Sequence, residues 1–433
     1  MKRYESWGRY PAASPVRVEV LRWVPEILPI TDTETVLAYG LGRSQGDSCL
    51  NDGGVLLDTS PLNRFIAFDA NQGTLTAEAG VTLAQILDLI VPQGWFLPVI
   101  PGTKHVTLGG AIANDIHGKN HRTAGSFGNH VREFTLLRSD GKKICSLAQN
   151  ADLFAATIGG LGLTGLITQA TLQLKRVASP WITVNSVPFT TIAEGIALIQ
   201  AQSAQHEYVV GQFDALPNSR GKGVLMVGDQ APVDSSGQTP KGKAITVPFV
   251  APNWLLNDLD MRAFNWWYNR HQVHLGQRTV HYTPYFFPLD SINYWNRLYG
   301  SRGFVQYQPV VPASRAGEVY AKILQLITTA RHGSYLASLK LFGDKKSVGM
   351  LSWPRPGIVI ALDFPFKGEQ TLKLLEECDV LVREAGGAVY PAKDTRMSAH
   401  SFQAYYPRWQ EFSRHIDPRF SSSFWRRVTN KFA

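Results

Sequence analysis

The chain has 433 residues, of which 44% are hydrophobic and 18% charged, and its formal net charge at pH 7 is +9. This length exceeds the size at which one hydrophobic core usually keeps growing, so two domains are expected. The positive charge is spread along the chain without a polybasic block, and no nucleic-acid-reading motif accompanies it. Nucleic acid is therefore not predicted as a partner.

The cysteines and the N-terminus bear on where the protein is found. Cys49, Cys145 and Cys378 lie far apart without a C-x-x-C pair, which favours a reducing compartment over a disulfide framework or a thiolate metal site. The first residues, "MKRYESWGRYPAASPV", contain no apolar signal-peptide core, and no run approaches the roughly 18 apolar residues of a membrane span. The sequence predicts a cytoplasmic protein that is at most peripheral at a membrane.

The N-terminal part of the chain, as far as Lys175, is dominated by short β-prone runs that glycine turns separate. These runs are "TVLAYGLG", "GVLLDTS", "RFIAFDA", "GTLTAEAG", "EFTLLRSDG" and "GLITQATLQL". One helix is clear, at residues 82–94, where Thr82 can cap the start, apolar residues recur at helical spacing, and Gly94 can end the helix.

From about residue 177 helices and strands alternate, which predicts a second domain of the α+β class. Expected helices are "TTIAEGIALIQAQSAQ", "GEVYAKILQLITTARHG" and "TLKLLEECDVLVREAGG", and expected strands include "YVVGQFDAL", "YLASLKLFG" and "GIVIALDFP". Residues 229–253 are polar and rich in proline and glycine, so we expect a mobile loop or lid there. The helix "TLKLLEECDVLVREAGG" is expected to end at Gly386-Gly387 and to lead into "AVYPAKDTR" and an aromatic, basic tail.

Three glycine-rich loops punctuate the first domain: "YGLGRSQGDS", "PGTKHVTLGGAIANDIHG" and "IGGLGLTGLIT". The glycines of the first loop do not follow the G-x-G-x-x-G spacing and precede a turn and a strand, so a Rossmann site is not predicted. No P-loop motif is present either. Each loop alone could be a tight turn, but together, with Gly109-Gly110 and Ala111 allowing close backbone approach, they favour a bound dinucleotide.

A metal site is the alternative for the second loop and the residues after it. His117 and His121 have i, i+4 spacing, and Asp115 and His130 lie nearby. Two ligands at that spacing need a helix, and glycines at positions 118, 125 and 128 interrupt the segment. We therefore predict no metal.

The loops and "AGSFGNHV" resemble, in order and spacing, the FAD-binding domain of the vanillyl-alcohol-oxidase-like flavoproteins. Within that family the chain resembles the flavin subunits of polyprenyl-phosphoryl-ribose 2-epimerases, through "RGFVQYQPVVP", "SLKLFG", "LDFPF", "YPAKDTR" and "FQAYYPRWQEF". The resemblance implies an α+β fold with a PCMH-type FAD-binding domain at 1–176 and a substrate domain with an antiparallel sheet at 177–387. Residues 388–433 would return to the FAD domain.

The resemblance implies FAD with its pyrophosphate on the first two loops and its isoalloxazine ring at the domain interface. The implied cofactor contacts are Gly40, Leu41, Gly42, Arg43, Ser44, Gln45, Gly46, Asp47, Gly102, Thr107, Leu108, Gly109, Gly110, Asn114, Asp115, Ile116, His117, Ile167 and Tyr390. Many relatives tether FAD to a histidine in the first loop, where this chain has Arg43. Because a guanidinium cannot form that link but can pair with phosphate, we expect non-covalent FAD.

Oxidation of a secondary alcohol on flavin needs a base for the hydroxyl proton. The resemblance places Lys393 in the flavin site, and a desolvated lysine can have its pKa lowered toward neutrality, so Lys393 is the first catalytic candidate. Asp394 could instead pair with Lys393 and keep it charged. His117 is the second candidate, beside the flavin, although it could be a buried structural histidine.

The resemblance also implies a substrate pocket lined by Lys119, Gln306, Gln308, Lys340 and Phe342. The two glutamines alternate on one face of a strand, while either lysine could simply be solvated. The chain departs from the family at three positions, with Gln45 in place of a common tyrosine and Val359 and Ala361 in place of Asn-x-Cys. These departures concern the sugar that is bound.

The predicted function is FAD-dependent oxidation of a sugar hydroxyl, expected to be the 2′-OH of polyprenyl-phosphoryl-β-D-ribose. This would be the first half of an epimerisation in cell-wall polysaccharide biosynthesis, completed by a separate NAD(P)H-dependent keto-reductase. The basic charge and residues 229–253 suit docking on a membrane that presents a lipid phosphate. The alternatives are a soluble aldonolactone or alditol oxidase, a flavin- or nucleotide-binding module without turnover, and a metal-dependent hydrolase.

Overall fold

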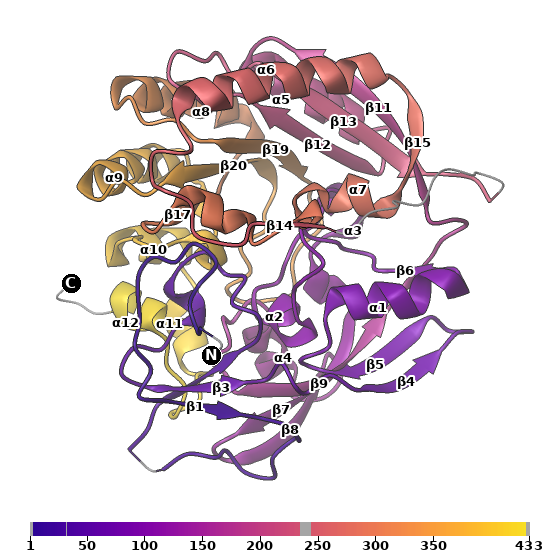
Figure 1. Cartoon of the computed structure of the whole chain (residues 1–433). Helices are drawn as coiled ribbons and strands as arrows, with labels where there is room; N and C mark the ends of the chain where they lie inside the picture. Colours follow the sequence, from indigo (N-terminus) through magenta and orange to yellow (C-terminus); the bar gives the residue numbers. More distant parts are fainter. Residues whose placement is uncertain (1–2, 32, 234–243, 430–433) are drawn as a thin grey trace.

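The computed structural model describes residues 3–31, 33–233 and 244–429 of the chain. Figure 1 shows two stacked parts, with the first strands in the lower part and a large sheet with its helices in the upper part. Leu37 and Leu56 of the lower part share one hydrophobic core with Val359 and Leu362 of the upper part, so the two parts pack directly on each other. No helix within the described ranges combines the length and the apolar character that crossing a membrane requires.

Besides a two-stranded sheet of β6 (Trp95–Phe96) and β10 (Lys175–Arg176), the lower part contains two larger sheets. Among the described residues these are a parallel sheet and an antiparallel sheet, in the orders β1 (Arg17–Val20), β3 (Val55–Asp58), β2 (Val36–Tyr39) and β4 (Phe65–Asp69), β5 (Thr74–Glu78), β9 (Leu166–Gln173), β7 (Val131–Arg138), β8 (Gly141–Ser146). Leu137 and Leu166 of the second sheet pack with Val55 and Leu57 of the first. The predicted β-prone runs of this region therefore form strands, and their apolar residues join the two sheets.

The helix predicted at 82–94 is confirmed as α1 (Leu83–Ile90). The Thr82 side chain accepts a hydrogen bond from the Gln85 backbone N–H in a capping box, and the chain turns at Gly94, whose φ is +75°. The expectation of one clear helix in this part is too low, since the structure adds α2 (Leu108–Ala113), α3 (His121–Ala124) and α4 (Ala151–Thr157). These helices are too short for an amphipathic period to reveal them.

The upper part is built on a large antiparallel sheet. In the described ranges its order is β15 (Arg278–His281), β11 (Trp181–Phe189), β13 (Gly223–Gln230), β12 (Tyr208–Phe213), β19 (Leu336–Phe342), β20 (Gly357–Pro365), β18 (Pro309–Val311), β21 (Ala388–Val389), and β17 (Phe304–Tyr307) also pairs with β20. Every pairing is antiparallel, as predicted for the substrate domain.

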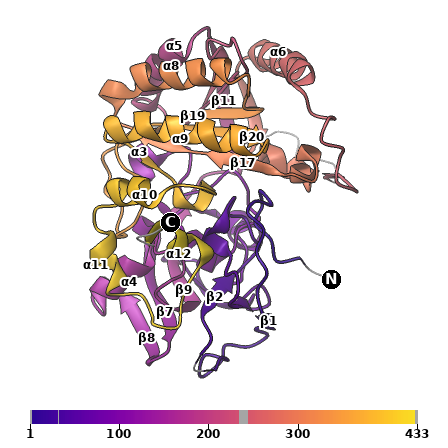
Figure 2. The same cartoon turned by 90° about the vertical axis from the view of Figure 1, so that its left-hand side faces the viewer.

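Helices lie on both faces of this sheet. The predicted helices are α5 (Ile192–Ser203), α8 (Ala313–Thr329) and α9 (Glu369–Glu384), and they pack together on one face. Figure 2 shows them on one side of the sheet and α6 (Asp258–Leu275), which contacts β11 and β13, on the other. The α6 helix therefore covers the face that the other three helices leave free.

The predicted loop at 229–253 falls partly outside the described residues, because 234–243 are not described. Its described ends are more ordered than expected of a loop. Residues 229 and 230 complete β13, and β14 (Ile245–Thr246) pairs in parallel with β16 (Ile292–Asn293).

After β21 the chain descends to the lower part through α10 (Ala399–Tyr405), α11 (Trp409–Ser413) and α12 (Ser423–Thr429). The Val36 backbone N–H donates to the Arg419 carbonyl, and the Ser421 backbone N–H donates back to the Val36 carbonyl. Phe420 is buried in the core between the two lower sheets. The C-terminal segment is thus part of the lower part's packing.

Candidate active site

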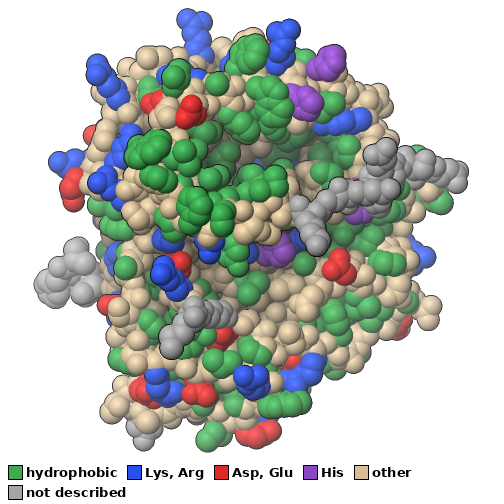
Figure 3. All heavy atoms as spheres, in the orientation of Figure 1, with side chains coloured by type: hydrophobic (Ala, Val, Ile, Leu, Met, Phe, Trp, Pro, Cys, Tyr) green, Lys and Arg blue, Asp and Glu red, His purple; other side chains and the backbone are tan. Residues whose placement is uncertain are grey.

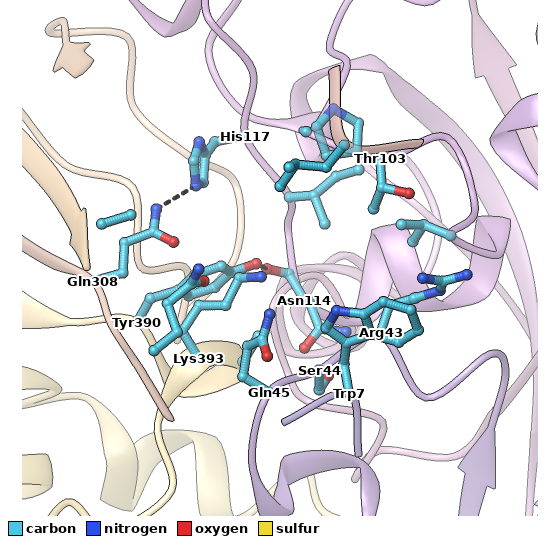
Figure 4. A pocket seen from close by; sticks show the side chains of 18 of the residues that line it. Trp7, Arg43, Ser44, Gln45, Thr103, Asn114, His117, Gln308, Tyr390 and Lys393 are labelled. Carbon is cyan, nitrogen blue, oxygen red and sulfur yellow. Dashed lines mark hydrogen bonds between the residues drawn. The ribbon is translucent and has the colours of Figure 1, made fainter. Parts of the chain in front are cut away.

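A cavity of about 530 Å³ lies between the glycine loops of the lower part and the sheet of the upper part. Figure 4 shows its polar lining from close by, with Lys393, Tyr390 and Gln45 near one another and Arg43 against Trp7. Since its walls combine segments from near both ends of the chain, the cavity exists only in the folded protein.

Glycines contribute bare backbone to the lower wall. Gly40, Gly102, Gly109 and Gly110 all line the cavity. A Cβ atom at Gly40 would lie 2.5 Å from the Thr107 Oγ1 atom, so a side chain there would push the two loops apart. Glycine at these positions lets backbone N–H groups approach a ligand, as a phosphate-bearing cofactor requires.

Most of the expected cofactor contacts line this cavity. They are Gly40, Leu41, Gly42, Arg43, Ser44, Gln45, Gly102, Thr107, Gly109, Gly110, Asn114, Ile116, His117, Ile167 and Tyr390. The Tyr390 hydroxyl donates to the Asn114 carbonyl at 2.7 Å, which joins the C-terminal segment to the second loop.

Four expected contacts do not line the cavity and have structural partners instead. Leu108 is fully buried in the lower core, and Gly46 packs so closely on Asp394 that a Cβ atom would overlap its carbonyl oxygen. The Asp115 carboxylate accepts hydrogen bonds from the Gly128 backbone N–H at 2.8 Å and the Ser352 hydroxyl at 2.6 Å. Asp47 forms an ion pair with Arg427. All four positions pack or pair within the protein and do not line the cavity.

Arg43, the residue in the place of the tethering histidine, stacks on Trp7 with its guanidinium carbon 4.0 Å from the ring centroid. Its Nε atom, the Oε1 atom of Gln45 and the Nδ1 atom of His117 are buried without a hydrogen-bond partner among the described residues. Buried polar groups are normally hydrogen-bonded, so these three atoms indicate a polar ligand in the cavity. The bare loops and these atoms fit FAD.

His117 is held from two sides. Its Nε2 atom accepts a hydrogen bond from the Gln308 side-chain amide at 2.8 Å, which leaves the proton of a neutral ring on Nδ1. Phe342 contacts the His117 ring edge-on, with a centroid distance of 4.9 Å. Phe342 does not line the cavity. The expectation that it contacts the substrate is therefore corrected, since Phe342 packs against His117 instead. Burial and the nearby Lys340 hold the pKa of His117 well below its usual value, so the ring is neutral.

Three lysines line the cavity: Lys119, Lys340 and Lys393. Burial is the main cause that lowers their pKa values, to about 7 for Lys119 and to about 8 for the other two. The Lys119 ammonium donates to the Tyr285 carbonyl and lies 4.1 Å from the centroid of that ring. None of the three forms an ion pair with a carboxylate in the part of the chain that the structure describes.

Asp394 is not the partner of Lys393. Its carboxylate pairs with the Arg427 guanidinium at 2.9 Å and accepts from the Met397 backbone N–H. The same guanidinium pairs with Asp47 at 2.7 Å, so Arg427 bridges two buried carboxylates beside the site. The alternative that Asp394 keeps Lys393 charged is therefore wrong.

The charged neighbour of Lys393 is Asp363, which sequence reasoning missed. Asp363 lines the cavity and accepts a hydrogen bond from the side-chain amide of Gln306, which also lines it. Burial raises the pKa of Asp363 to about 6, while its negative charge opposes the lowering of the Lys393 pKa. An aspartate inside the apolar strand "GIVIALDFP" was the available signal, since a buried charge needs a reason.

The three positions that depart from the family pattern do not all line the cavity. Gln45 and Ala361 line the cavity, whereas Val359 is buried in the sheet away from it. The candidate metal ligands also separate, since His121 stacks on Phe342 and His130 bonds the Ala124 carbonyl. Within the described ranges no cluster of three metal-binding side chains is found.

The chain matches the family of FAD binding domains over residues 31–145. It is 37% identical to the decaprenylphosphoryl-β-D-ribose oxidase of Mycolicibacterium smegmatis, over 99% of this chain and 97% of that protein. An uncharacterized protein of Streptomyces coelicolor is 31% identical over 77% of this chain and 94% of its own length. The L-gulonolactone oxidase of Mus musculus is 28% identical over 40% of each chain.

These similarities bear out the PCMH-type α+β fold and FAD as the cofactor. The lactone oxidase shares less than half of the chain, whereas the ribose oxidase aligns along nearly all of it, substrate sheet included. The chain belongs to the decaprenylphosphoryl-β-D-ribose oxidase family of FAD-dependent oxidoreductases.

Proposed function

We propose that this chain oxidises the 2′-hydroxyl of a polyprenyl-phosphoryl-β-D-ribose to the 2′-keto sugar. The observation that carries the proposal is the set of three half-buried lysines in one cavity, none of which forms an ion pair with a carboxylate in the described chain. A phosphoryl sugar supplies the negative charge that such a cluster needs. A neutral lactone supplies none.

Each side chain has a role in this reaction. FAD, when bound, would supply the acceptor for the hydride that leaves the carbon carrying the hydroxyl. Lys393 in its neutral form accepts the hydroxyl proton, and its pKa of about 8 keeps that form accessible near neutral pH. The neutral His117 ring, fixed by Gln308, can donate from Nδ1 to a sugar oxygen. Lys119 and Lys340 then bind the phosphate.

In the proposed function, different parts of the chain bind the cofactor and the substrate. We assign residues 1–176 and 388–433 to cofactor binding and residues 177–387 to substrate binding. The oxidation leaves a ketone, so an epimerisation also requires a separate NAD(P)H-dependent keto-reductase to return a hydride to the opposite face. The lipid-linked substrate requires peripheral contact with a membrane.

The test of the function is flavin reduction under anaerobic conditions. Purified holoenzyme is mixed with polyprenyl-phosphoryl ribose or with aldonolactones, and the visible flavin bands are followed. Bleaching with the phosphoryl ribose is expected. Bleaching with lactones alone would reject the proposal in favour of an aldonolactone oxidase.

We predict that FAD is released by acid precipitation and leaves a yellow supernatant. The physical reason is that Arg43, stacked on Trp7, offers hydrogen-bond donors to a phosphate but no nucleophile to the flavin ring. The absorbance of supernatant and pellet measures the partition. A yellow pellet would show a covalent link and would reject this role of Arg43.

We predict that kcat at saturating phosphoryl ribose rises with pH through about 8 and then levels off, whereas KM rises over the same range as Lys119 and Lys340 lose the charge that binds the phosphate. The neutral form of Lys393 is the base, and its fraction increases as pH rises through the pKa of that lysine. In the Asp363→Asn variant the nearby negative charge is lost, the Lys393 pKa falls, and the rise moves to lower pH. A rise that moves to higher pH in this variant would contradict the assignment.

A further inference from the structure

The outer face of α6 exposes large apolar side chains to solvent. Leu259, Trp266 and Trp267 are 76%, 63% and 53% exposed, and Arg270 and His274 lie among them at helical spacing. We call these five residues the α6 outer face. Helices of soluble proteins usually bury such side chains in a core, so their exposure here indicates a binding surface.

The opposite face of the same helix forms part of the active-site cavity. Phe264, Asn265, Tyr268 and Asn269 line that cavity and follow one another at helical spacing. The α6 helix is therefore the wall between the cavity and the α6 outer face. A ligand that extends from the cavity past the side of α6 would therefore reach the α6 outer face.

Further large apolar side chains are exposed on the segments that precede and follow α6 in the sequence. Of the 22 large hydrophobic side chains that are exposed in the described ranges, 13 lie between residues 233 and 294. Figure 3 shows hydrophobic side chains gathered on this face around a hollow. The 13 include Ile245, Phe249, Trp254 and Tyr294. This concentration separates the region from the scattered exposed residues of other surfaces.

The charges on α6 are segregated along the helix. Both acidic residues, Asp258 and Asp260, lie in the first turn, where they complement the helix dipole. From residue 261 to 275 the helix carries arginines and histidines but no acidic residue. The Arg270 guanidinium lies 5.7 Å from the Trp266 ring centroid, so charge and aromatic surface are interleaved. This composition is typical of a helix that lies in the interface of an anionic bilayer.

We infer that the α6 outer face docks on an anionic lipid bilayer, with the helix parallel to the surface. This inference rests on the proposed function, because the polyprenyl tail of the substrate can then stay in the bilayer while its phosphoryl sugar enters the cavity behind α6. The helix has 18 residues and is about 27 Å long, which presents its outer face along the membrane plane.

The test is flotation of the FAD-loaded enzyme with vesicles of phosphatidylcholine, with and without phosphatidylglycerol. The wild type is expected to float with the phosphatidylglycerol vesicles. The double variant Trp266→Ser, Trp267→Ser is expected to bind at least about tenfold more weakly, since two aromatic side chains no longer enter the interface. The matched control is Trp23→Ser, because Trp23 is 73% exposed on the lower part and should not change binding.

Activity separates a docking role from damage to the fold. The double variant should keep its FAD and oxidise a phosphoryl ribose with a short, water-soluble prenyl tail at the wild-type rate. It should be slow only with long-chain substrate embedded in vesicles. If the double variant loses FAD, Leu259→Ser on the same face replaces it in the test.

The outcomes distinguish this inference from the proposed function. Equal flotation of the double variant and the wild type, or no flotation of the wild type, overturns the docking inference even if the soluble substrate is oxidised. Flotation without oxidation of either substrate overturns the proposed substrate instead. A wild-type dimer that the double variant converts to monomer, with flotation unchanged, would assign the α6 outer face to a second copy of the chain.

Discussion

Replacing Lys393 with methionine is expected to slow flavin reduction by the phosphoryl ribose about 10²–10⁴-fold, the usual effect of removing a general base. Methionine keeps most of the side-chain volume in the cavity, so FAD should remain bound. The rate of flavin bleaching in anaerobic stopped-flow mixing measures the effect. Bleaching at the wild-type rate would show that the base is another group.

Two further variants separate the base from charge and binding effects. Lys393→Arg keeps the positive charge but cannot lose a proton near neutral pH, so it should be as slow as Lys393→Met. Lys340→Met should mainly raise KM, because Lys340 binds the phosphate in the proposed function. The exposed Lys322, which pairs with Glu318 on α8, is a neutral control position.

Replacing Arg427 with methionine is expected to lower the free energy of unfolding by about 3–5 kcal/mol, because removal of one partner leaves buried charges uncompensated. Arg427 pairs with Asp47 and with Asp394, and both carboxylates are almost fully buried. Chemical denaturation of the holoenzyme measures the loss. Arg408→Met removes an exposed ion pair with Glu411 and should change stability little.

The pH dependence of this loss has a defined sign. Burial raises the pKa of Asp47 even with Arg427 present, and loss of the guanidinium raises it further. A carboxyl whose pKa is higher in the folded than in the unfolded protein destabilises the fold as pH rises through that range. The variant should therefore be closest to wild type under mildly acidic conditions. A loss that is the same at acidic and neutral pH would contradict the bridging role of Arg427.

Helices and strands that bury one face could be predicted because their apolar residues follow the period of the element. This holds for α1, α5, α8 and α9 and for the strands of both parts. The α6 helix escaped sequence reasoning because its apolar residues lie on two faces, one toward the cavity and one toward solvent, so no single periodic stripe marks it. The α2 helix was missed because it has six residues, among them two glycines and two alanines.

The glycine loops, Lys393, His117, Lys119 and Lys340 could be predicted from the sequence because they lie in short motifs that resemble those of a known family. The partners of these residues could not be identified in the same way. Asp363 belongs to a different strand and motif from Lys393, and Asp47 and Arg427 lie near opposite ends of the chain. No local sequence pattern indicates which distant residues pair. The sequence therefore allows Asp394 as a partner of Lys393, whereas in the structure Asp394 pairs with Arg427.

The sequence by itself determined the α+β class and the FAD-binding loops, and most of the site residues predicted from it line the cavity. Those features depend on local backbone conformation and side-chain chemistry, and short stretches of sequence encode both. Only the tertiary structure decided which charges face one another, which loop residues turn inward, and that one helix separates the active site from an exposed apolar surface. Those outcomes depend on packing between distant segments, where burial and pairing are properties of the whole fold.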